Sequence, residues 1–242
     1  MVQIYNDSYR PICGDAHPGS LGAKFWDTWE SARPAVGAII ENAQSGNGSY
    51  LENLRMFLER RGYIEEAFMT FSFSPISNEK GEIGGLFHPI TETTDRMLHA
   101  RRNGILRDHA TRLNEAKTME DIYRVASYDL EAYQLDMPYL AFYEWDEDVA
   151  KLKASYGIAS EQLAGLDTAK LLSLGISPGL STSLVVGHSA IEGTGQTLGP
   201  YPEIPLQAVA MPFFLPGQTR SLGFAIAAVS SRRALDEAYR SF

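Results

Sequence analysis

The sequence predicts an α+β fold, in which antiparallel sheets and helices occupy separate stretches of the chain. Residues 64–76 alternate between apolar and polar side chains, which is the period of two expected of a half-buried strand. Residues 93–117 contain no proline and repeat their apolar side chains at the helical period. Two apolar runs, 207–215 and 222–229, predict paired strands. These patterns predict two mixed domains, 1–100 and 101–242, the second beginning with the long helix.

The composition is that of a globular protein with an acidic charge balance. Among the 242 residues, 21 Lys and Arg against 30 Asp and Glu give a formal net charge of −9. Nucleic-acid phosphates require a basic face, so we expect no nucleic-acid partner. Cys13 is the sole cysteine, which excludes an intrachain disulfide and fits a reducing cytosol. There is no run of about 18 apolar residues and no signal-peptide pattern, so we expect a cytoplasmic protein without membrane insertion.

The first domain should begin with a short strand and several short helices. Residues 2–5 are strand-like, and Asn6 with Asp7 can cap a first helical turn. Glycines and prolines divide residues 8–46 into short helical pieces. In the last piece three apolar residues are spaced to form one helix face: Val36, Ile39 and Ile40.

Three strands should follow, over 50–60, 64–76 and 83–91. The middle strand directs four apolar side chains to one face: Ala67, Met69, Phe71 and Phe73. In the third strand, Gly84 and Gly85 either weaken the pairing or allow another backbone to approach closely. The turns between the strands are short, which predicts an antiparallel meander.

The helix over 93–117 carries an apolar stripe that includes Leu98, Ile105, His109 and Leu113. Four arginines are expected to lie mostly off this stripe: Arg101, Arg102, Arg107 and Arg112. The stripe can pack against a second copy of the chain, giving a homodimer, or against one of the chain's own sheets, and the pattern leaves both open. Thr118 with Asp121 predicts a capping box and a second helix. The buried face of that helix should be Ile122, Val125, Ala126 and Leu130.

The second domain should contain a hairpin, several further strands and a final helix. Residues 138–145 and 152–156 predict a hairpin, and 184–186 a short strand. The stretch 160–200 is rich in Gly, Ser and Pro and poorly periodic. Residues 232–242 predict a helix at the end of the sequence.

Several segments resemble a known pair of sensory domains. YNDSYRPI (5–12), HPGSLGAKFWDTW (17–29), RRGYIEEAFMTFSFSPI (60–76) and GEIGGLFHPITETTDR (81–96) resemble a PAS domain. DMPYLAFYEWDED (136–148), AVAMPFFLPGQ (208–218), LGFAIAAVS (222–230) and RRALDEAYRSF (232–242) resemble a GAF domain. The pair is similar to the sensory region of bacterial and fungal hybrid histidine kinases. The resemblance implies a PAS-like antiparallel sheet with short helices, a connecting helix and a GAF-like α/β sheet domain.

The resemblance also implies a sensory function without catalysis in this chain. A small ligand or a partner protein would regulate an output of the histidine-kinase type through the linker helix, in a homodimer. The kinase phosphoacceptor and ATP-binding motifs do not occur in the sequence, so we expect no enzyme activity. The first strand of a PAS sheet, which would precede Val2, is also missing, and such an open edge must be covered or paired. The alternative is a structural dimerisation or protein-interaction module that binds no small molecule.

The predicted ligand-binding residues are aromatic side chains and one histidine: Trp26, Trp29, Phe71, Phe73 and His88. Ligand pockets are lined mainly by such side chains, although the same residues can simply fill the core. His88 alternates with Leu86 and Ile90, so it can face the pocket. The same two interpretations apply to Phe142, Phe213 and Phe224 in the second domain.

Other chemistry is weakly indicated. No cofactor and no metal site is predicted: Cys13 lacks the surrounding motif of flavin attachment, and the second domain has no cysteine for a bilin. A hydrolase would pair His188 and Ser189 with Asp167 or Glu192. Adjacent residues of a strand point to opposite faces, which argues against the His188–Ser189 pair.

Overall fold

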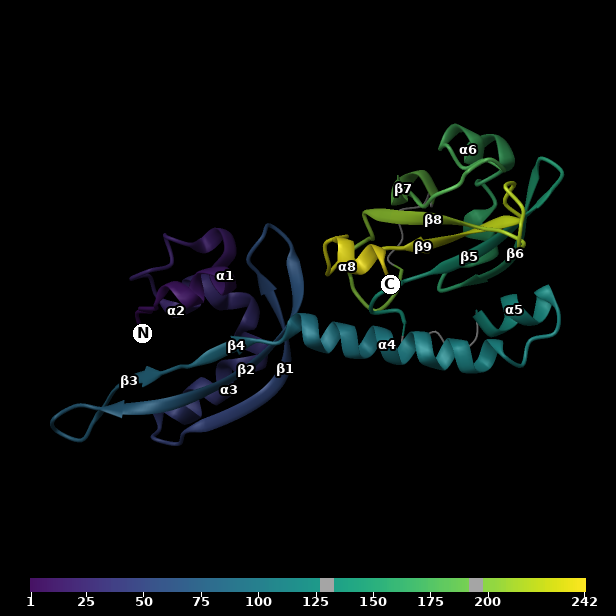
Figure 1. The fold of residues 1–242 in the computed structure, drawn as a ribbon. Helices are drawn as coiled ribbons and strands as arrows, with labels where there is room; N and C mark the ends of the chain where they lie inside the picture. The colour runs from purple at the N-terminus through teal and green to yellow at the C-terminus, as the bar shows by residue number, and fades with distance from the viewer. Residues whose placement is uncertain (127–132, 192–197) are drawn as a thin grey trace. The chain divides into compact units, whose positions relative to one another are not determined.

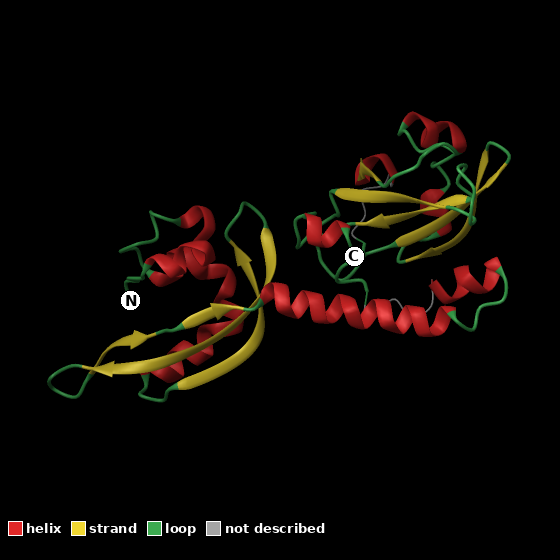
Figure 2. Ribbon diagram, in the orientation of Figure 1, coloured by secondary structure: helices red, strands yellow, loops and turns green. Residues whose placement is uncertain are grey.

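The computed structural model describes residues 1–126, 133–191 and 198–242 (Figure 1). The chain divides into two compact units, Met1–Arg101 and Arg102–Phe242, and the division falls inside helix α4 (Thr94–Leu113). Each unit contains an antiparallel sheet together with separate helices (Figure 2). This arrangement confirms the predicted α+β class.

The first unit begins with short helices instead of a strand. The predicted strand over 2–5 is wrong, since only an isolated antiparallel bridge joins Val2 to Lys24. The helical pieces follow as η1 (Asp7–Tyr9), α1 (Arg10–Cys13), η2 (Gly14–Ala16), α2 (Phe25–Trp29), η3 (Glu30–Ala32) and α3 (Arg33–Gln44). Asn6 precedes η1 but makes no side-chain capping hydrogen bond. In α3 the predicted apolar face is confirmed, because Val36 and Ile40 are buried.

The first sheet consists of β1 (Ser49–Glu59), β2 (Ile64–Ser77), β3 (Ile83–Phe87) and β4 (Ile90–Glu92). β1 pairs antiparallel with β2, and both β3 and β4 pair with the other edge of β2. The single strand predicted over 83–91 is therefore wrong in its middle. It is interrupted at His88 and Pro89, where proline has no backbone N–H to continue a ladder.

One face of this sheet packs against the short helices. Met69, Phe71 and Phe73 of β2, together with Met56 and Leu58 of β1, form one core with side chains of the helical pieces. The helical side chains in this core include Ile12, Trp29, Val36 and Ile40. The apolar and polar side chains of residues 64–76 therefore alternate between the two faces of the folded strand, as predicted.

Helix α4 contacts other parts of the same chain through both apolar and charged side chains. Leu98 and Ile105 are buried, and Ile105 packs with Leu140, Ala225 and Ala227 of the second unit. The expectation that Arg102 lies off the packed face is wrong: its side chain is buried and its Nε donates to Asp136 Oδ1 at 3.0 Å. The sequence left open whether the apolar stripe packs on a second copy or on the chain's own sheet. Ile105 packs on the chain's own sheet.

The helix after α4 begins where its capping pattern predicts. In front of α5 (Met119–Ala126), Asp121 N donates to Thr118 Oγ1, and Thr118 N donates to Asp121 Oδ2. The predicted buried face is wrong in one position, since Tyr123 is buried and Ile122 is exposed. Leu130, the last residue of that face, lies outside the described residues.

The second sheet contains five strands in the order β6-β5-β9-β8-β7, all antiparallel. Their bounds are β5 (Leu140–Asp146), β6 (Val149–Tyr156), β7 (Leu184–Gly187), β8 (Gln207–Phe213) and β9 (Gly223–Ala228). The predicted hairpin and the pairing of the two apolar runs are both confirmed. The helices are η5 (Ser160–Leu163), α6 (Thr168–Ser173), α7 (His188–Ile191) and α8 (Glu237–Arg240). The helix predicted over 232–242 is thus confined to four residues.

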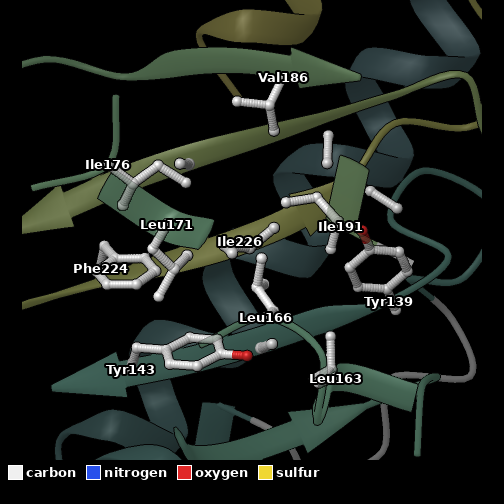
Figure 3. Close-up of a cluster of buried hydrophobic side chains, with 14 of the residues drawn as sticks. Tyr139, Tyr143, Leu163, Leu166, Leu171, Ile176, Val186, Ile191, Phe224 and Ile226 are labelled. Carbon is white, nitrogen blue, oxygen red and sulfur yellow. The ribbon is translucent and has the colours of Figure 1, made fainter. Parts of the chain in front are cut away.

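The central strand β9 is buried along its whole length because each face of the sheet has its own core. Phe224, Ile226 and Ala228 belong to the larger core, together with residues such as Tyr143 and Leu171 (Figure 3). Ala225 and Ala227 belong to the core on the opposite face.

Candidate functional site

A small apolar pocket lies between the sheet and the helices of the first unit. Its volume is about 30 Å³, which is enough for roughly one or two water-sized molecules. The lining comes from the short helices, from β1 and β2, and from the strand β4: Tyr9, Ile12, Phe25, Trp29, Ala32, Val36, Met56, Leu58, Met69, Phe71, Phe73, His88 and Ile90. The pocket contains no charged side chain, so it suits an uncharged occupant.

Four of the five predicted ligand-binding residues line this pocket together. Trp29, Phe71, Phe73 and His88 surround it, although they come from α2, β2 and the break between β3 and β4. Trp26 does not line it. Its indole instead lies under the guanidinium of Arg33, with Arg33 Cζ 4.3 Å from the ring centroid. The neighbouring Phe25 points into the pocket in its place.

His88 is fixed by stacking and by one hydrogen bond. Its ring stacks on Phe73, with centroids 4.1 Å apart and planes at 9°, and meets Phe71 edge-on at 5.3 Å. Its Nδ1 lies 2.8 Å from the carbonyl oxygen of Ser72. Because a carbonyl oxygen only accepts, Nδ1 carries the proton and donates.

The environment of His88 keeps the imidazole neutral. Burial lowers its pKa, and the hydrogen bond to Ser72 only partly opposes this effect. With Nδ1 protonated in a neutral ring, Nε2 is a hydrogen-bond acceptor. No described group is hydrogen-bonded to Nε2. His88 Nε2 is therefore an open acceptor in a wall that is otherwise mostly apolar.

Two further polar side chains of the lining belong to Trp29 and Tyr9. Trp29 Nε1 donates to Gln3 Oε1 at 3.1 Å, and burial raises the pKa of the Tyr9 phenol. Cys13 is fully buried, and Ser20 Oγ donates to its sulfur at 3.7 Å. Cys13 thus belongs to the core, as a small apolar side chain does.

A larger groove opens beside the pocket and shares part of its wall. It measures about 1060 Å³ and lies between residues 1–9 on one side and residues 84–91 on the other. Tyr9, Phe25, Phe71, Phe73, His88 and Ile90 line both spaces. An occupant of the groove would therefore touch the mouth of the pocket.

The strand at this wall leads directly into helix α4, and buried ion pairs hold the junction. Arg60 donates to both oxygens of Glu92, at 2.8 and 2.6 Å, and to Glu65 at 2.9 Å. Thr94 Oγ1 accepts from the backbone N–H of Phe68 at 3.0 Å. Burial favours the neutral form of Glu92, but the charge and hydrogen bonds of Arg60 outweigh it and lower the carboxyl pKa.

A second buried carboxylate fixes the first turns of α4 to the polar face of the sheet. Glu66 is completely buried and accepts from Arg55 of β1 at 2.6 Å. It also accepts two hydrogen bonds from Arg101 of α4, at 3.0 and 2.9 Å. Burial would raise the pKa of Glu66, but the two guanidinium groups, Arg101 first, lower it. The carboxylate is therefore ionised at neutral pH.

The described candidate groups of the second unit have separate structural roles. His188 is buried with Nδ1 3.3 Å from Tyr139 Oη, whereas Ser189 is exposed. Asp167 caps helix α6 by accepting from the N–H of Lys170, and Glu192 lies outside the described residues. His188 and Ser189 lie in helix α7. The prediction that they are neighbours in a strand is therefore wrong.

The aromatic residues considered in the second unit serve packing. Phe224 stacks on Tyr143 with centroids 5.0 Å apart, inside the larger core. Phe142 and Phe213 both contact Tyr123, at centroid distances of 5.5 and 6.4 Å. Among the described residues, no group of three or more His, Cys, Asp or Glu is placed to hold a metal ion. No described helix has the length and apolar character needed to cross a membrane.

Sequence reasoning missed Phe25 and the inner lining from the helices and β1. A five-residue helix such as α2 is too short for its periodicity to distinguish Phe25 from Trp26. The signals that were available were the apolar face of α3 and the alternation of β1, which place Val36, Met56 and Leu58 on the packed side.

No protein-family model matches the chain, and no curated protein matches it. Solved structures resemble it at low identity. A GAF domain of a phosphoenolpyruvate-protein phosphotransferase from Coxiella burnetii is 14% identical, with a TM-score of 0.40 over 59% of this chain and 85% of that one. The chromophore-binding domain of a bacteriophytochrome from Stigmatella aurantiaca is 12% identical, with a TM-score of 0.37 over 97% of this chain and 84% of that one.

A bacteriophytochrome from R. palustris is 10% identical, with a TM-score of 0.36 over 92% of this chain and 48% of that one. At such identities and TM-scores, these likenesses establish neither a family nor a function for this chain.

Proposed function

We propose that this chain is a non-catalytic sensory signalling module of the PAS–GAF type. In this proposal an uncharged, largely apolar ligand binds at the mouth of the first unit's pocket and changes how helix α4 is held. The output is a domain of the histidine-kinase type, on the same polypeptide or on a partner. The sequence motifs of residues 5–96 and 136–242 support the domain types, and the site geometry supports the mode of action.

The observation that carries the proposal is the short path from the site to the helix. His88 lines the pocket, and two residues later β4 begins and runs through Glu92 into α4. The carboxylate of Glu92 is held by Arg60, and Thr94 is held by Phe68. A ligand that moves His88 or Ile90 would therefore act on the residues that anchor the first turn of α4.

The ligand class follows from the walls of the site. The aromatic side chains of Phe71, Phe73 and Phe25 in the lining favour a flat apolar ring. The Nε2 acceptor of His88 favours a molecule with one N–H or O–H donor. A charged ligand is disfavoured because no charged side chain lines the pocket and burial of an unpaired charge is costly.

Indole, a flat ring with a single N–H, is a suitable probe. We expect saturable NMR shifts at His88 and Phe73 when indole is added to the full chain. His88→Phe retains the stack but lacks the acceptor, so it should weaken indole binding about fivefold to tenfold, the value of one hydrogen bond. Trp26→Phe is the matched control, since Trp26 does not line the pocket.

A protein-interaction module without a small ligand is the second candidate, and the small size of the pocket favours it. Native mass spectrometry of the purified protein separates the two. A retained small molecule supports the sensory proposal. A mass equal to that of the polypeptide, combined with no saturable indole shift, contradicts the ligand step and favours the second candidate.

A further inference from the structure

Asparagine is followed by glycine at two places in the chain, and the two places differ in structure. Asn47 and Gly48 lie in the turn between α3 and β1 (Figure 1), whereas Asn103 and Gly104 lie within helix α4. Such a pair can modify itself, because the backbone nitrogen after an asparagine can attack the side-chain amide. Glycine has no side chain to obstruct this attack. Since both pairs have the same two residues, the fold decides which pair reacts.

The attacking group must be an unbonded backbone N–H, and Gly48 has one. Among the described residues, its N–H donates to no acceptor. Asn47 and Gly48 are both exposed and lie outside any helix or strand. Water and hydroxide therefore reach the nitrogen and the side-chain amide together.

The side chain of Asn47 is held by one exposed contact. Its Nδ2 donates to Asn42 Oδ1 at 3.1 Å. A hydrogen bond contributes only modest net stability, because water competes for the same groups. The contact with Asn42 therefore does not prevent the Asn47 amide from rotating toward Gly48.

The second pair is protected by the helix that contains it. Helix α4 runs without a break through Thr94–Leu113, so the N–H of Gly104 is directed at the carbonyl oxygen of Ala100, four residues earlier. The helical N–H points along the helix axis, whereas the side chain of Asn103 extends outward from it. Attack at Asn103 therefore requires a local opening of α4.

We infer that Asn47 is a site of spontaneous deamidation, whereas Asn103 remains intact in the folded chain. The Gly48 nitrogen loses its proton to solvent and bonds to Asn47 Cγ. The Cγ–Nδ2 bond breaks, and Nδ2 leaves as ammonia. Water then opens the resulting cyclic imide: cleavage at Cγ gives aspartate, and cleavage at the backbone carbonyl carbon gives isoaspartate. The sum consumes one water and releases one ammonia, and nothing is oxidised or reduced.

The isoaspartate product lengthens the backbone by one carbon directly before β1. β1 begins at Ser49, which pairs with Phe73 of β2. A Cβ at Gly48 would lie 3.5 Å from the carbonyl oxygen of Phe73, so the turn already lies against β2. The added carbon therefore loosens the first pairs between β1 and β2. This inference does not depend on the proposed ligand or on the proposed output.

The first test incubates the full chain in neutral buffer and follows both asparagines by peptide mapping with mass spectrometry. Asn47 should convert at least about tenfold faster than Asn103 in the folded chain. In concentrated urea the fold no longer separates the two pairs, so their rates should agree within about twofold. Equal rates in the folded chain would overturn the inference. A difference that persists in urea would overturn it as well, because the cause would then be the local sequence.

Gly48→Ala tests the attacking nitrogen. Gly48 does not have a left-handed φ, and an added Cβ makes only ordinary contacts, so the fold accepts alanine. The methyl group obstructs the attack, and conversion at Asn47 should slow at least about tenfold. Gly85→Ala is the matched control because a Cβ there meets open space, and it should leave the rate at Asn47 unchanged. An unchanged rate in Gly48→Ala contradicts the mechanism.

The last test measures what the product does to the sheet. Chromatography isolates the isoaspartate form, and its amides at Ser49–Leu51 should exchange hydrogen at least about tenfold faster than in the unmodified chain. Asn47→Asp is the matched control, since it adds the charge without the extra backbone carbon, and it should leave this exchange unchanged. Unaltered exchange at Ser49–Leu51 in the isoaspartate form overturns the link between Asn47 and the pairing of β1 with β2.

Discussion

The two sheets share antiparallel pairing but differ in what covers them. In the second sheet, β9 is buried at every residue because cores lie on both faces. Its edge strand β6 carries lysines, Lys151 and Lys153, which pair with Asp146 and Glu144. In the first sheet, the short helices pack on one face, the other face contains the ion pairs of Glu66 with Arg55 and Arg101, and residues 83–91 at one edge carry no charge.

This difference explains why the candidate site lies in the first unit. The second sheet has cores on both faces, which leaves little of its apolar surface for another molecule. A sheet with one packed face, one ionic face and an open uncharged edge retains surface that another molecule can use. The ionic face also contains Glu66, which joins the sheet to α4 through Arg101.

The largest effect is expected at the ionic face. Glu66→Gln removes the negative charge but keeps the size of the side chain, so Arg55 and Arg101 lose their counter-ion. Because both guanidinium groups keep some access to water, the cost in unfolding free energy should lie at the lower end of the about 3–5 kcal/mol expected for breaking a buried pair. Native-state hydrogen exchange of the β2 amides measures this loss. Lys151→Gln, in an exposed pair of the second sheet, is the control and should leave exchange unchanged. A Glu66→Gln protein as stable as the unmodified chain would show that the ionic face is not needed.

A smaller effect should distinguish the two cores. Val36 lines the pocket, so Val36→Ile can extend into free space and should leave the unfolding free energy nearly unchanged. Ala210 is fully buried in the larger core of the second unit, where Ala210→Val overpacks and should cost about 1–3 kcal/mol. Urea unfolding of each variant checks the comparison. Equal costs at the two positions would mean that the first core has no usable space.

The smallest effect concerns pH and the pocket. Burial lowers the pKa of His88, so the folded state releases its proton more readily than the unfolded chain. The stability contributed by the neutral ring is therefore fully present above the ordinary value of 6.5 and is lost as pH falls below it. NMR titration of the His88 ring should give a pKa below 6.5. His88→Phe should abolish this part of the pH dependence of β2 exchange, and its persistence would place the effect elsewhere.

Much of the fold was predictable because long elements carry clear periods. Residues 64–76, the capping box at Thr118 and the paired runs 207–215 and 222–229 all form as their patterns indicate. The predictions that were wrong concern positions whose environment is set by tertiary contacts. Pro89 splits one strand into two, the carboxylate of Asp136 allows Arg102 to be buried, and Tyr123 replaces Ile122 on the packed face of α5.

The site was predictable for residues on the alternating strand and less so elsewhere. Phe71 and Phe73 follow from the period of β2, and His88 follows from its neighbours Leu86 and Ile90. Whether Phe25 or Trp26 lines the pocket depends on the orientation of one short helix. The stacking of Arg33 on Trp26 helps to fix that orientation. The groove depends on how residues 1–9 and residues 84–91 lie against each other, and local sequence patterns do not give that placement.

The most direct test of the account measures hydrogen exchange in the first turns of α4 with and without saturating indole, in the full chain. Binding is monitored independently by the His88 ring shift. The account predicts that exchange at Thr94–Arg101 changes by at least about tenfold, about 1.4 kcal/mol, while exchange in β9 stays constant. Indole that binds at His88 and leaves Thr94–Arg101 unchanged would contradict transmission from the site to the helix.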